Sequence, residues 1–377
     1  MAQESQITQK QEFFRQAVRE LAQKRIAPHA EEIDRSGDFP QDIANILSQN
    51  QLLGLIASRE YGGQGAGLVE LCLAIEELSK ACPISAIICA TQNLGCRLIL
   101  TAGSEEQKNK YLPGLSAGKS IYGLALNEPR VGADSATGSV TAASDGESYT
   151  LNGSGFFITN GDVAHITSVF ASHIDKEMVA AFIVEKDTPG FSIAKMKDLT
   201  GGQARYANEG LLKDCHLHQD SLLGRKEHSI DTVTDLSSLA SMTTAARATG
   251  LAQAAFDYSL EYAKQRVQFG RPIAKFQSIQ VMLANMAAKV EASRCLCYKA
   301  AFLLEQQDKD AARFSAIAKY FASDAAMGMT CDAVQILGGY GTIMDYPVDR
   351  MMRNAKLTQI TEGNNQAQQI AIATMLI

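Results

Sequence analysis

The chain has 377 residues and a formal net charge of −6 at pH 7. This length is enough for two or three domains around a large buried core. The acidic balance argues against a general nucleic-acid binder, which usually carries a basic stripe. No apolar run approaches the roughly 20 residues of a membrane span, and the polar start Met-Ala-Gln-Glu-Ser-Gln lacks a signal-peptide pattern. We therefore expect a cytoplasmic protein without a membrane span.

The eight cysteines include no Cys-x-x-Cys pair and lie mostly in apolar helical stretches. This usage is typical of reduced thiols in the core of a cytoplasmic protein. No metal site is expected from them.

The first 120 residues are predicted to be almost entirely helical. Apolar residues return at helical spacing, and the expected helices are 11–35, Pro40 to Leu47, 68–82, 84–102 and 104–117. The glycine-rich stretch 61–67 has no predicted strand before it, so a tight connection between helices is favoured over a phosphate loop.

The pattern changes at Ile121. From Gly138 to Leu223, segments rich in Thr, Ser and Val are broken by Asp-Gly, Asn-Gly and Pro-Gly turns, including Asn152-Gly153. Helical patterns return after about Glu227, over 230–265, 275–306, 310–338 and 347–377. The chain is thus predicted to be α+β, with an N-terminal helical domain (1–120), a middle β domain (121–226) and a C-terminal helical bundle (227–377).

Two strings in the β region carry the first functional signal. One reads Leu126-Asn127-Glu-Pro followed by Gly132-Ala133-Asp, and the other reads Asn152-Gly-Ser-Gly-Phe-Phe157-Ile158-Thr159-Asn-Gly. Either one alone is also compatible with an ordinary hairpin. Together, and in this order, they resemble the two flavin-contacting strings of the acyl-CoA dehydrogenase family. The resemblance implies bound FAD, with Leu126 and Asn127 along the flavin, Phe157 and Ile158 beside the ring, and Thr159 near N5.

A third string, Arg266-Val-Gln268-Phe269-Gly-Arg-Pro-Ile-Ala-Lys-Phe276-Gln, resembles one of the most specific motifs of that family. The resemblance implies that Arg266 meets the FAD diphosphate of a neighbouring subunit, because a diphosphate needs a guanidinium and backbone N–H groups. It assigns the same cofactor to Gln268, Phe269 and Phe276, and places Gln335 and Gly339 near the adenosine half. A site shared between chains implies a homotetramer or homodimer. The alternative is an exposed arginine at a helix end.

The segment Thr361-Glu362-Gly363-Asn364 resembles the family loop Ile-Tyr-Glu-Gly-Thr. The resemblance implies that Glu362 is the base that removes the α-proton of an acyl thioester, a weak acid that demands a well-positioned base. Thr361 and Gly363 would then contact substrate, and Asn364 and Gln366 the cofactor. A helix cap is the alternative role for Glu362. Some members place the base on an earlier helix, but the matching position here is Ala240, which cannot serve.

The substrate side departs from the family pattern more than the flavin side. The positions in question are Ala133 for Ser, Ser238 for Asp, Ser241 for the Arg that contacts CoA, Thr361 for Tyr, and Asn364 for Thr. Losing a guanidinium from an anion site removes about 1.5–3 kcal/mol per charged hydrogen bond. A carrier-protein-bound acyl group is therefore an alternative to acyl-CoA. Arg205 and Arg247 are charges that the pattern does not require, and they are expected to be solvated or structural unless one meets a polar acyl group or a carrier.

The sequence leads to an FAD-dependent acyl-thioester dehydrogenase that passes electrons to an electron-transfer flavoprotein or to oxygen. An enoyl-thioester reductase or an acyl-thioester oxidase on the same scaffold remains open. A non-catalytic scaffold homologue is a further alternative, although it would not need Glu362, Phe157, Thr159 and Arg266.

Overall fold

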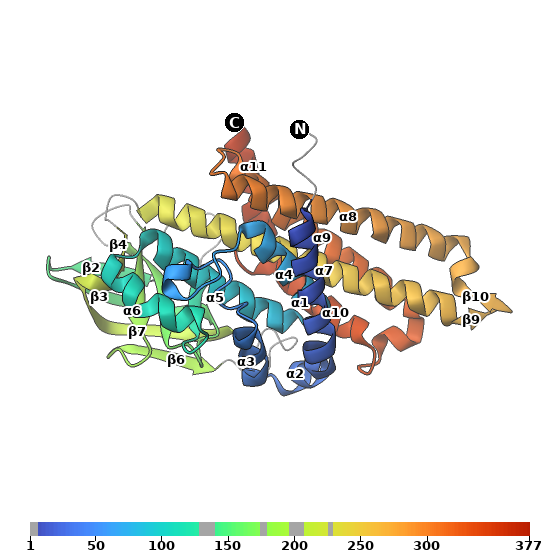
Figure 1. The fold of residues 1–377 in the computed structure, drawn as a ribbon, viewed down its shortest axis with the longest axis horizontal. Helices are drawn as coiled ribbons and strands as arrows, with labels where there is room; N and C mark the ends of the chain where they lie inside the picture. Colours follow the sequence, from blue (N-terminus) through green and yellow to red (C-terminus); the bar gives the residue numbers. More distant parts are fainter. Residues whose placement is uncertain (1–6, 128–139, 174–178, 196–206, 225–228) are drawn as a thin grey trace. The chain divides into compact units, whose positions relative to one another are not determined.

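The computed structural model describes residues 7–127, 140–173, 179–195, 207–224 and 229–377 (Figure 1). The chain forms two compact units. The helical unit comprises Met1–Arg35, Leu68–Ala86 and Ser241–Ile377, and the β-containing unit comprises Ser36–Gly67 and Ile87–Ala240. Ala133 and Arg205 lie outside the described residues.

The helices follow the predicted order. Those of the first third are α1 (Gln9–Leu21), α2 (Ala30–Ser36), α3 (Gln41–Gln49), α4 (Leu68–Ala81), α5 (Pro83–Ala102) and α6 (Glu105–Ser116). Those of the last third are α7 (Ser229–Gln265), α8 (Gln277–Glu305), α9 (Ala311–Leu337), α10 (Pro347–Ile360) and α11 (Asn365–Leu376). The stretch 59–67, with the turn Arg59–Tyr61 and a left-handed Gly62, connects helices as predicted.

In the sequence, the strands of the β-containing unit come after α6 and before α7. They are β1 (Tyr122–Asn127), β2 (Val140–Ser144), β3 (Ser148–Thr159), β4 (Ile166–His173), β5 (Val179–Glu185), β6 (Phe191–Lys195), β7 (Ala207–His218) and β8 (Leu222–Leu223). They pair in the order β6-β7-β3-β1-β4-β5-β8, and β2 pairs with both β3 and β4. The β1–β4 and β2–β4 pairs are parallel and the others antiparallel. The predicted α+β class and the order helical, β, helical are confirmed.

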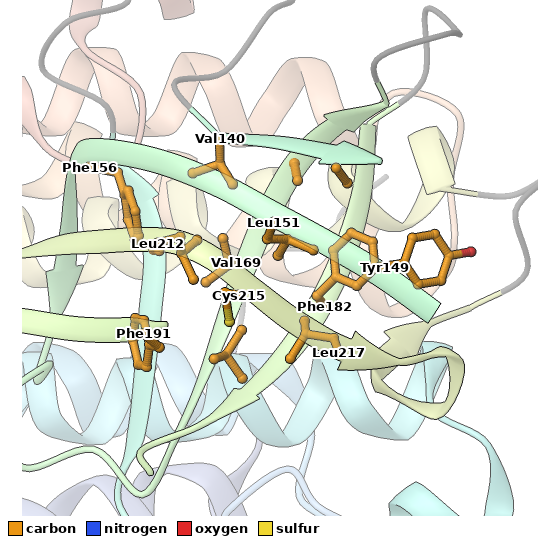
Figure 2. Close-up of a cluster of buried hydrophobic side chains, with 14 of the residues drawn as sticks. Val140, Tyr149, Leu151, Phe156, Val169, Phe182, Phe191, Leu212, Cys215 and Leu217 are labelled. Atoms are coloured by element: carbon orange, nitrogen blue, oxygen red, sulfur yellow. The ribbon is translucent and has the colours of Figure 1, made fainter. Parts of the chain in front are cut away.

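An apolar cluster fills the β-containing unit (Figure 2). Alternate residues of β3, among them Tyr149, Leu151 and Phe156, are buried, as expected for a strand with one face on a core. Tyr149 meets Phe182 of β5 edge-on, with ring centroids 4.9 Å apart. This packing fixes which residues of β3 face away from the core, and Phe157 and Thr159 are among them.

Three local predictions need correction. The predicted helix 11–35 is interrupted by a π-helical turn (Ala22–Ile26) and a 3₁₀ turn (Ala27–His29), because Pro28 removes a backbone donor. Asn152-Gly153 is not a turn but lies inside β3, where a register shift between Leu151 and Gly153 absorbs it. The stretch 347–377 is two helices, separated where Glu362 and Gly363 both have positive φ.

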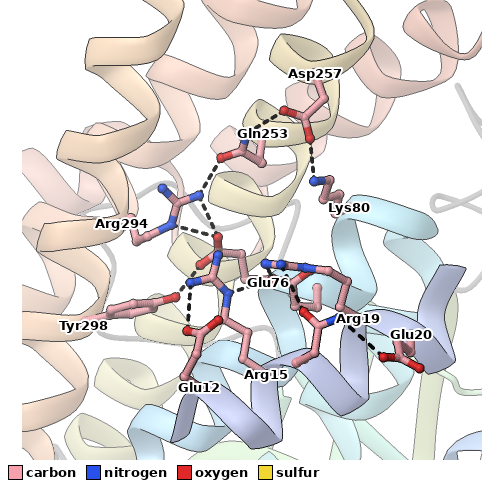
Figure 3. Close-up of polar contacts among 12 residues, drawn as sticks. Glu12, Arg15, Arg19, Glu20, Glu76, Lys80, Gln253, Asp257, Arg294 and Tyr298 are labelled. Carbon is pink, nitrogen blue, oxygen red and sulfur yellow. Dashed lines mark hydrogen bonds and ion pairs between the residues drawn. The ribbon is translucent and has the colours of Figure 1, made fainter. Parts of the chain in front are cut away.

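A network of buried charges connects the helices of the helical unit (Figure 3). Glu77 of α4 is 4% exposed and accepts hydrogen bonds from Arg15 and Arg19 of α1. Its neighbour Glu76 accepts from Arg294 and Tyr298 of α8 at 2.9 and 2.7 Å. Each buried carboxylate therefore has more than one donor, which is what makes burial of the charge tolerable.

Two expectations about burial are corrected as well. Helix α5 has the length and apolar composition of a membrane span, contrary to the prediction, although 83% of its apolar window is buried, as in the core helix of a soluble protein. All eight cysteines are free, but only six are buried, because Cys295 and Cys331 are exposed.

Candidate active site

The loop between α10 and α11 places a carboxylate on strained backbone. Helix α10 ends at Ile360, and the Thr361 hydroxyl donates back to the Leu357 carbonyl at 3.0 Å. Glu362 then adopts φ +55° and Gly363 φ +83°. A left-handed φ costs a residue other than glycine about 1–3 kcal/mol and persists only where surrounding contacts impose it. The conformation of Glu362 is therefore imposed by the contacts around the loop.

Helix α7 holds the carboxylate itself. Thr244 and Arg247 are three residues apart and so share one face of α7. The Thr244 hydroxyl donates to Glu362 Oε2, and Arg247 Nη2 lies 3.3 Å from the same oxygen. Arg247 Nη2 also donates to the Thr361 hydroxyl at 3.2 Å. The side chains of Arg247 and Glu362 are 3% and 9% exposed, so this ion pair is largely removed from water.

Helix α9 holds the two ends of the same loop. Lys319 Nζ donates to the Gln359 carbonyl at 3.3 Å and to Asn365 Oδ1 at 2.8 Å. The Asn365 amide donates to Ser323 Oγ at 2.9 Å and to Asp324 Oδ1 at 2.7 Å. The backbone on either side of Glu362 is therefore fixed from α9, while its carboxylate is fixed from α7.

Lys319 has no exposed surface. Burial, followed by the nearby charge of Arg247, lowers the pKa of Lys319 to about 7, although Glu362 and Asp324 oppose this shift. A neutral amine keeps two N–H donors, which is the number that the contacts with Gln359 and Asn365 use. Lys319 can therefore hold the loop with or without its charge.

A second cluster lies where α7 ends. Val267–Gln268 and Arg271–Pro272 pair as a hairpin whose turn residues, Phe269 and Gly270, have φ +51° and +77°. Two positive φ values are the signature of a type I′ turn. Phe269 is 92% exposed, and its ring meets Phe276 edge-on at 6.2 Å. Val267 of the same hairpin is 54% exposed, so the hairpin presents two apolar side chains to solvent.

Arg266 enters an open pocket of about 480 Å³ beside this hairpin. Its guanidinium lies 5.3 Å from the ring centroid of Tyr340, and among the described residues it forms no ion pair. A Cβ added to Gly338 or Gly339 would meet no atom within 4 Å, so the backbone of this turn faces open space. The pocket lining consists of Tyr262, Arg266, Gln268, Ile273, Ile336, Leu337, Gly338, Gly339, Tyr340 and Ile343. An unpaired guanidinium among apolar and aromatic residues fits an anion that carries a flat ring system.

The two predicted flavin strings are neighbours in the sheet. In the β1–β3 pair, Leu124 lies opposite Thr159, and Asn127 lies opposite Phe157. Phe157 and Thr159 are half-buried, whereas Ile158 points into the core and has no exposed surface. Leu126 is half-buried near the end of β1. The strand period thus brings Phe157 and Thr159 to one face and sends Ile158 to the other.

Other predicted residues have surroundings that the sequence did not disclose. Asn364 caps α11, since its side chain accepts from the Ala367 N–H at 2.8 Å. Gln335 and Gln366 are exposed, and Ser241 is 3% exposed in α7. Their proposed ligand contacts remain predictions.

Sequence reasoning missed Thr244 and Lys319. The available signal was the group of threonines in the stretch 242–252 and a lysine in the alanine-rich stretch 315–326. Arg247, which was expected to be solvated or structural, is 2% exposed and bonded to Glu362.

Comparison with known proteins places the chain in a family. Models of the N-terminal, middle and C-terminal domains of acyl-CoA dehydrogenases match residues 8–119, 123–215 and 238–377. The chain is 40% identical over 375 residues to an acyl-CoA dehydrogenase of Bacillus subtilis (strain 168), covering 98% of this chain and 99% of the relative.

Solved structures agree. The butyryl-CoA dehydrogenase of Megasphaera elsdenii is 37% identical, with a TM-score of 0.92 over 98% of this chain and 99% of the other. The prolyl acyl carrier protein oxidase AnaB is 28% identical, with a TM-score of 0.93 over 98% and 100% of the two chains.

The fold and these likenesses first define a class, the FAD-dependent oxidoreductases, with FAD as cofactor. Within that class, the chain belongs to the acyl-CoA dehydrogenase family. The resemblance seen in the sequence is thereby confirmed, and so is the predicted cofactor.

Proposed function

We propose that the protein is an acyl-thioester α,β-dehydrogenase in which Glu362 removes the α-proton. The observation that carries this proposal is the loop geometry, a carboxylate on left-handed backbone held by separate contacts from α7 and α9. A capping residue would not need such restraint, and here Asn364 already caps α11. General bases act through position first, because the carboxylate must reach one proton of a bound substrate.

The residues of the chain divide the work. Thr244 and Arg247 fix the direction of the Glu362 carboxylate, which takes the proton from Cα. Arg247 also bonds the Thr361 hydroxyl at 3.2 Å, so the same guanidinium positions the residue before the base. FAD, when bound, supplies the acceptor for the hydride that leaves Cβ. The product is the 2-enoyl thioester.

Residues that would hold FAD are present in both units. Phe157 and Thr159, on one face of β3, fit the flavin ring, and Arg266 with the Gly338–Gly339 turn fits the diphosphate and adenosine. The nearly bare ring of Phe269 supports the view that a neighbouring subunit completes this site. We therefore propose that the protein is a homotetramer or a homodimer. We also propose that it is located in the cytoplasm.

We further propose that the acyl group is presented on the phosphopantetheine arm of a carrier protein. Ser241 and Ser238 offer no cation to CoA, and α7 contains a single arginine, Arg247, which is engaged with the base. The likeness to AnaB, described as a prolyl acyl carrier protein oxidase, favours a carrier protein as the group that presents the acyl chain. The likeness to butyryl-CoA dehydrogenase favours CoA, so the two handles must be compared directly.

The test is anaerobic bleaching of the bound flavin by one acyl group offered on CoA and on a carrier protein. Bleaching by either thioester supports the dehydrogenase, and faster bleaching by the carrier form supports the proposed handle. Equal rates on both handles would contradict the carrier preference. No bleaching by any thioester would contradict the dehydrogenase and favour an enoyl reductase or a scaffold.

An oxidase is the second candidate, supported by the same likeness to AnaB. It differs from a dehydrogenase only in the electron acceptor. Reoxidation of the reduced enzyme by oxygen at a rate near turnover would favour the oxidase, and slow reoxidation in air would favour an electron-transfer flavoprotein as acceptor.

A further inference from the structure

The guanidinium beside the candidate base has unused donors. Arg247 is 2% exposed, and its recorded side-chain bonds, to Thr361 and Glu362, both come from Nη2. Its Nε is buried, and within the described part of the chain no acceptor reaches it. A buried donor without an acceptor destabilises the fold, and the penalty is larger for a charged group.

A purely structural ion pair in the same unit uses its donors differently. Arg19 engages Glu77 through both Nε and Nη2, at 3.0 and 2.7 Å, in the fork that matches a carboxylate. Arg247 instead meets Glu362 through one nitrogen at 3.3 Å. Neutralising Glu362 therefore does not account for the way Arg247 is held, since its Nε has no partner among the described residues.

The charges around the loop also leave room for an anion. Among the described residues, the basic groups near Glu362 are Arg247 and Lys319, and both are buried. The other carboxylate in this described region is Asp324, an exposed residue that accepts hydrogen bonds from the Gln359 and Asn365 amides. Within the described part of the chain, two buried basic side chains thus stand beside one buried carboxylate. A second carboxylate or a carbonyl oxygen would complete the balance.

We propose that Arg247 binds an oxygen of the acyl chain, so that the substrate is a short acyl thioester bearing a carboxylate or a carbonyl group near Cβ. This inference rests on the proposed dehydrogenase. Arg247 contacts the base directly, so the oxygen it binds lies within a few ångströms of the carbon that Glu362 deprotonates.

A hydrocarbon chain offers no such acceptor and would bury the guanidinium against methylene groups. A site built to hydrogen-bond a substrate rejects the analogue that lacks the polar group. One charged hydrogen bond corresponds to about a tenfold to a hundredfold preference.

The test compares three thioesters that match in heavy-atom shape: succinyl, its amide succinamyl, and 4-methylpentanoyl. Each is offered on CoA and on a carrier protein to the holoenzyme, and anaerobic flavin reduction is recorded at several concentrations. In the wild type we expect succinyl or succinamyl to exceed 4-methylpentanoyl in the specificity constant by about tenfold to a hundredfold. In Arg247→Met that ratio should fall to near one. Arg247→Lys keeps the positive charge but loses the planar guanidinium. In this variant the preference for succinyl over 4-methylpentanoyl should be intermediate, and the preference for succinamyl should disappear.

Equal or faster reduction by 4-methylpentanoyl in the wild type would overturn the inference while leaving the dehydrogenase intact. A ratio that survives Arg247→Met, or a loss that is uniform across all three esters, would also overturn it, since a uniform loss assigns Arg247 to the thioester carbonyl. If Arg247→Met does not retain flavin, the inference is tested by the specificity ratios of Arg247→Lys alone. If none of these esters and no simple acyl-CoA reduces the flavin, the proposed function fails, and the inference fails with it.

Discussion

Glu77 and Glu362, two carboxylates of the helical unit that meet arginine, stand in clusters that are built differently. Glu77 accepts from Arg15 and Arg19 at 2.7–3.0 Å, and its backbone lies within α4. Burial raises the pKa of Glu77, but the hydrogen bonds from Arg19 and Arg15 outweigh it, so the pKa is lowered. Glu362 meets one nitrogen of Arg247 at 3.3 Å and stands on left-handed backbone. The first cluster is satisfied and regular, whereas the second is strained and leaves donors unused.

This difference separates stability from function. A satisfied network joins α1, α4 and α8 without requiring any further partner (Figure 3). Strain and unused donors persist only where the rest of the fold imposes them, and such positions cluster at sites of chemistry or binding. The two clusters should therefore respond to mutation in opposite ways.

The largest effect is expected for Glu77→Gln. Removing one partner of a buried ion pair leaves Arg15 and Arg19 uncompensated, which costs about 3–5 kcal/mol. Chemical denaturation of the holoenzyme measures the loss. Glu12→Gln is the matched control, because its contact with Arg15, at 3.6 Å and 51% exposed, is superficial and such pairs contribute about 1 kcal/mol or less. Equal losses in the two variants would contradict the comparison.

Arg266→Gln is expected to weaken FAD binding by about 1.5–3 kcal/mol, roughly 10- to 150-fold in Kd. The reason is the loss of a guanidinium that has no ion pair among the described residues. Fluorescence titration of the apoprotein with FAD measures the change. Arg313→Gln, which removes a surface pair with Asp310 at 3.0 Å, is the control and should bind FAD normally. Unchanged affinity in Arg266→Gln would remove Arg266 from the cofactor site.

Lys319→Met tests the buried amine through pH. The pKa of Lys319 is about 7 in the fold and about 10.4 in an unfolded chain, so the unfolded chain binds more protons between these values. Stability from this residue therefore rises with pH, by at most about 1.4 kcal/mol per unit, from about pH 7 to about pH 10. Between about pH 7 and pH 10, the free energy of unfolding of the wild type should rise relative to that of Lys319→Met. Below pH 7 the difference between the two proteins should stay constant. Lys356→Met, at an exposed position, should show no such trend, and a flat difference for both variants would contradict the burial effect.

Thr244→Val is expected to have the smallest effect. It removes one hydrogen bond that aims the Glu362 carboxylate, worth about 0.5–1.5 kcal/mol, which lowers flavin reduction by up to about tenfold. Thr249→Val is the control in the same helix, because the Thr249 hydroxyl donates to the Ala245 carbonyl of that helix at 2.8 Å. Stopped-flow reduction at matched flavin content compares the two. An equal slowing in both would show that Thr244 acts only through the packing of α7.

Much of this picture could be predicted from sequence. Periodicity gave the helices and the β region, and short strings identified the family through Glu362, Arg266 and the Phe157–Thr159 strand. The surroundings of Glu362 could not be predicted, because Thr244, Arg247 and Lys319 come from helices that are far apart in the chain. The turn predicted at Asn152-Gly153 was wrong, because the pairing of β3 with β7 along their length outweighs the local turn propensity of this dipeptide.

The most direct test of the account is anaerobic flavin reduction in Glu362→Gln. The variant should keep its fold and its FAD, since the amide is isosteric with the carboxylate and its oxygen can still accept from Thr244 and Arg247. Without a base, the rate with a thioester that bleaches the wild type should fall by about 10²- to 10⁴-fold. A rate within a fewfold of the wild type would show that another group removes the α-proton, and would contradict the role assigned to Glu362.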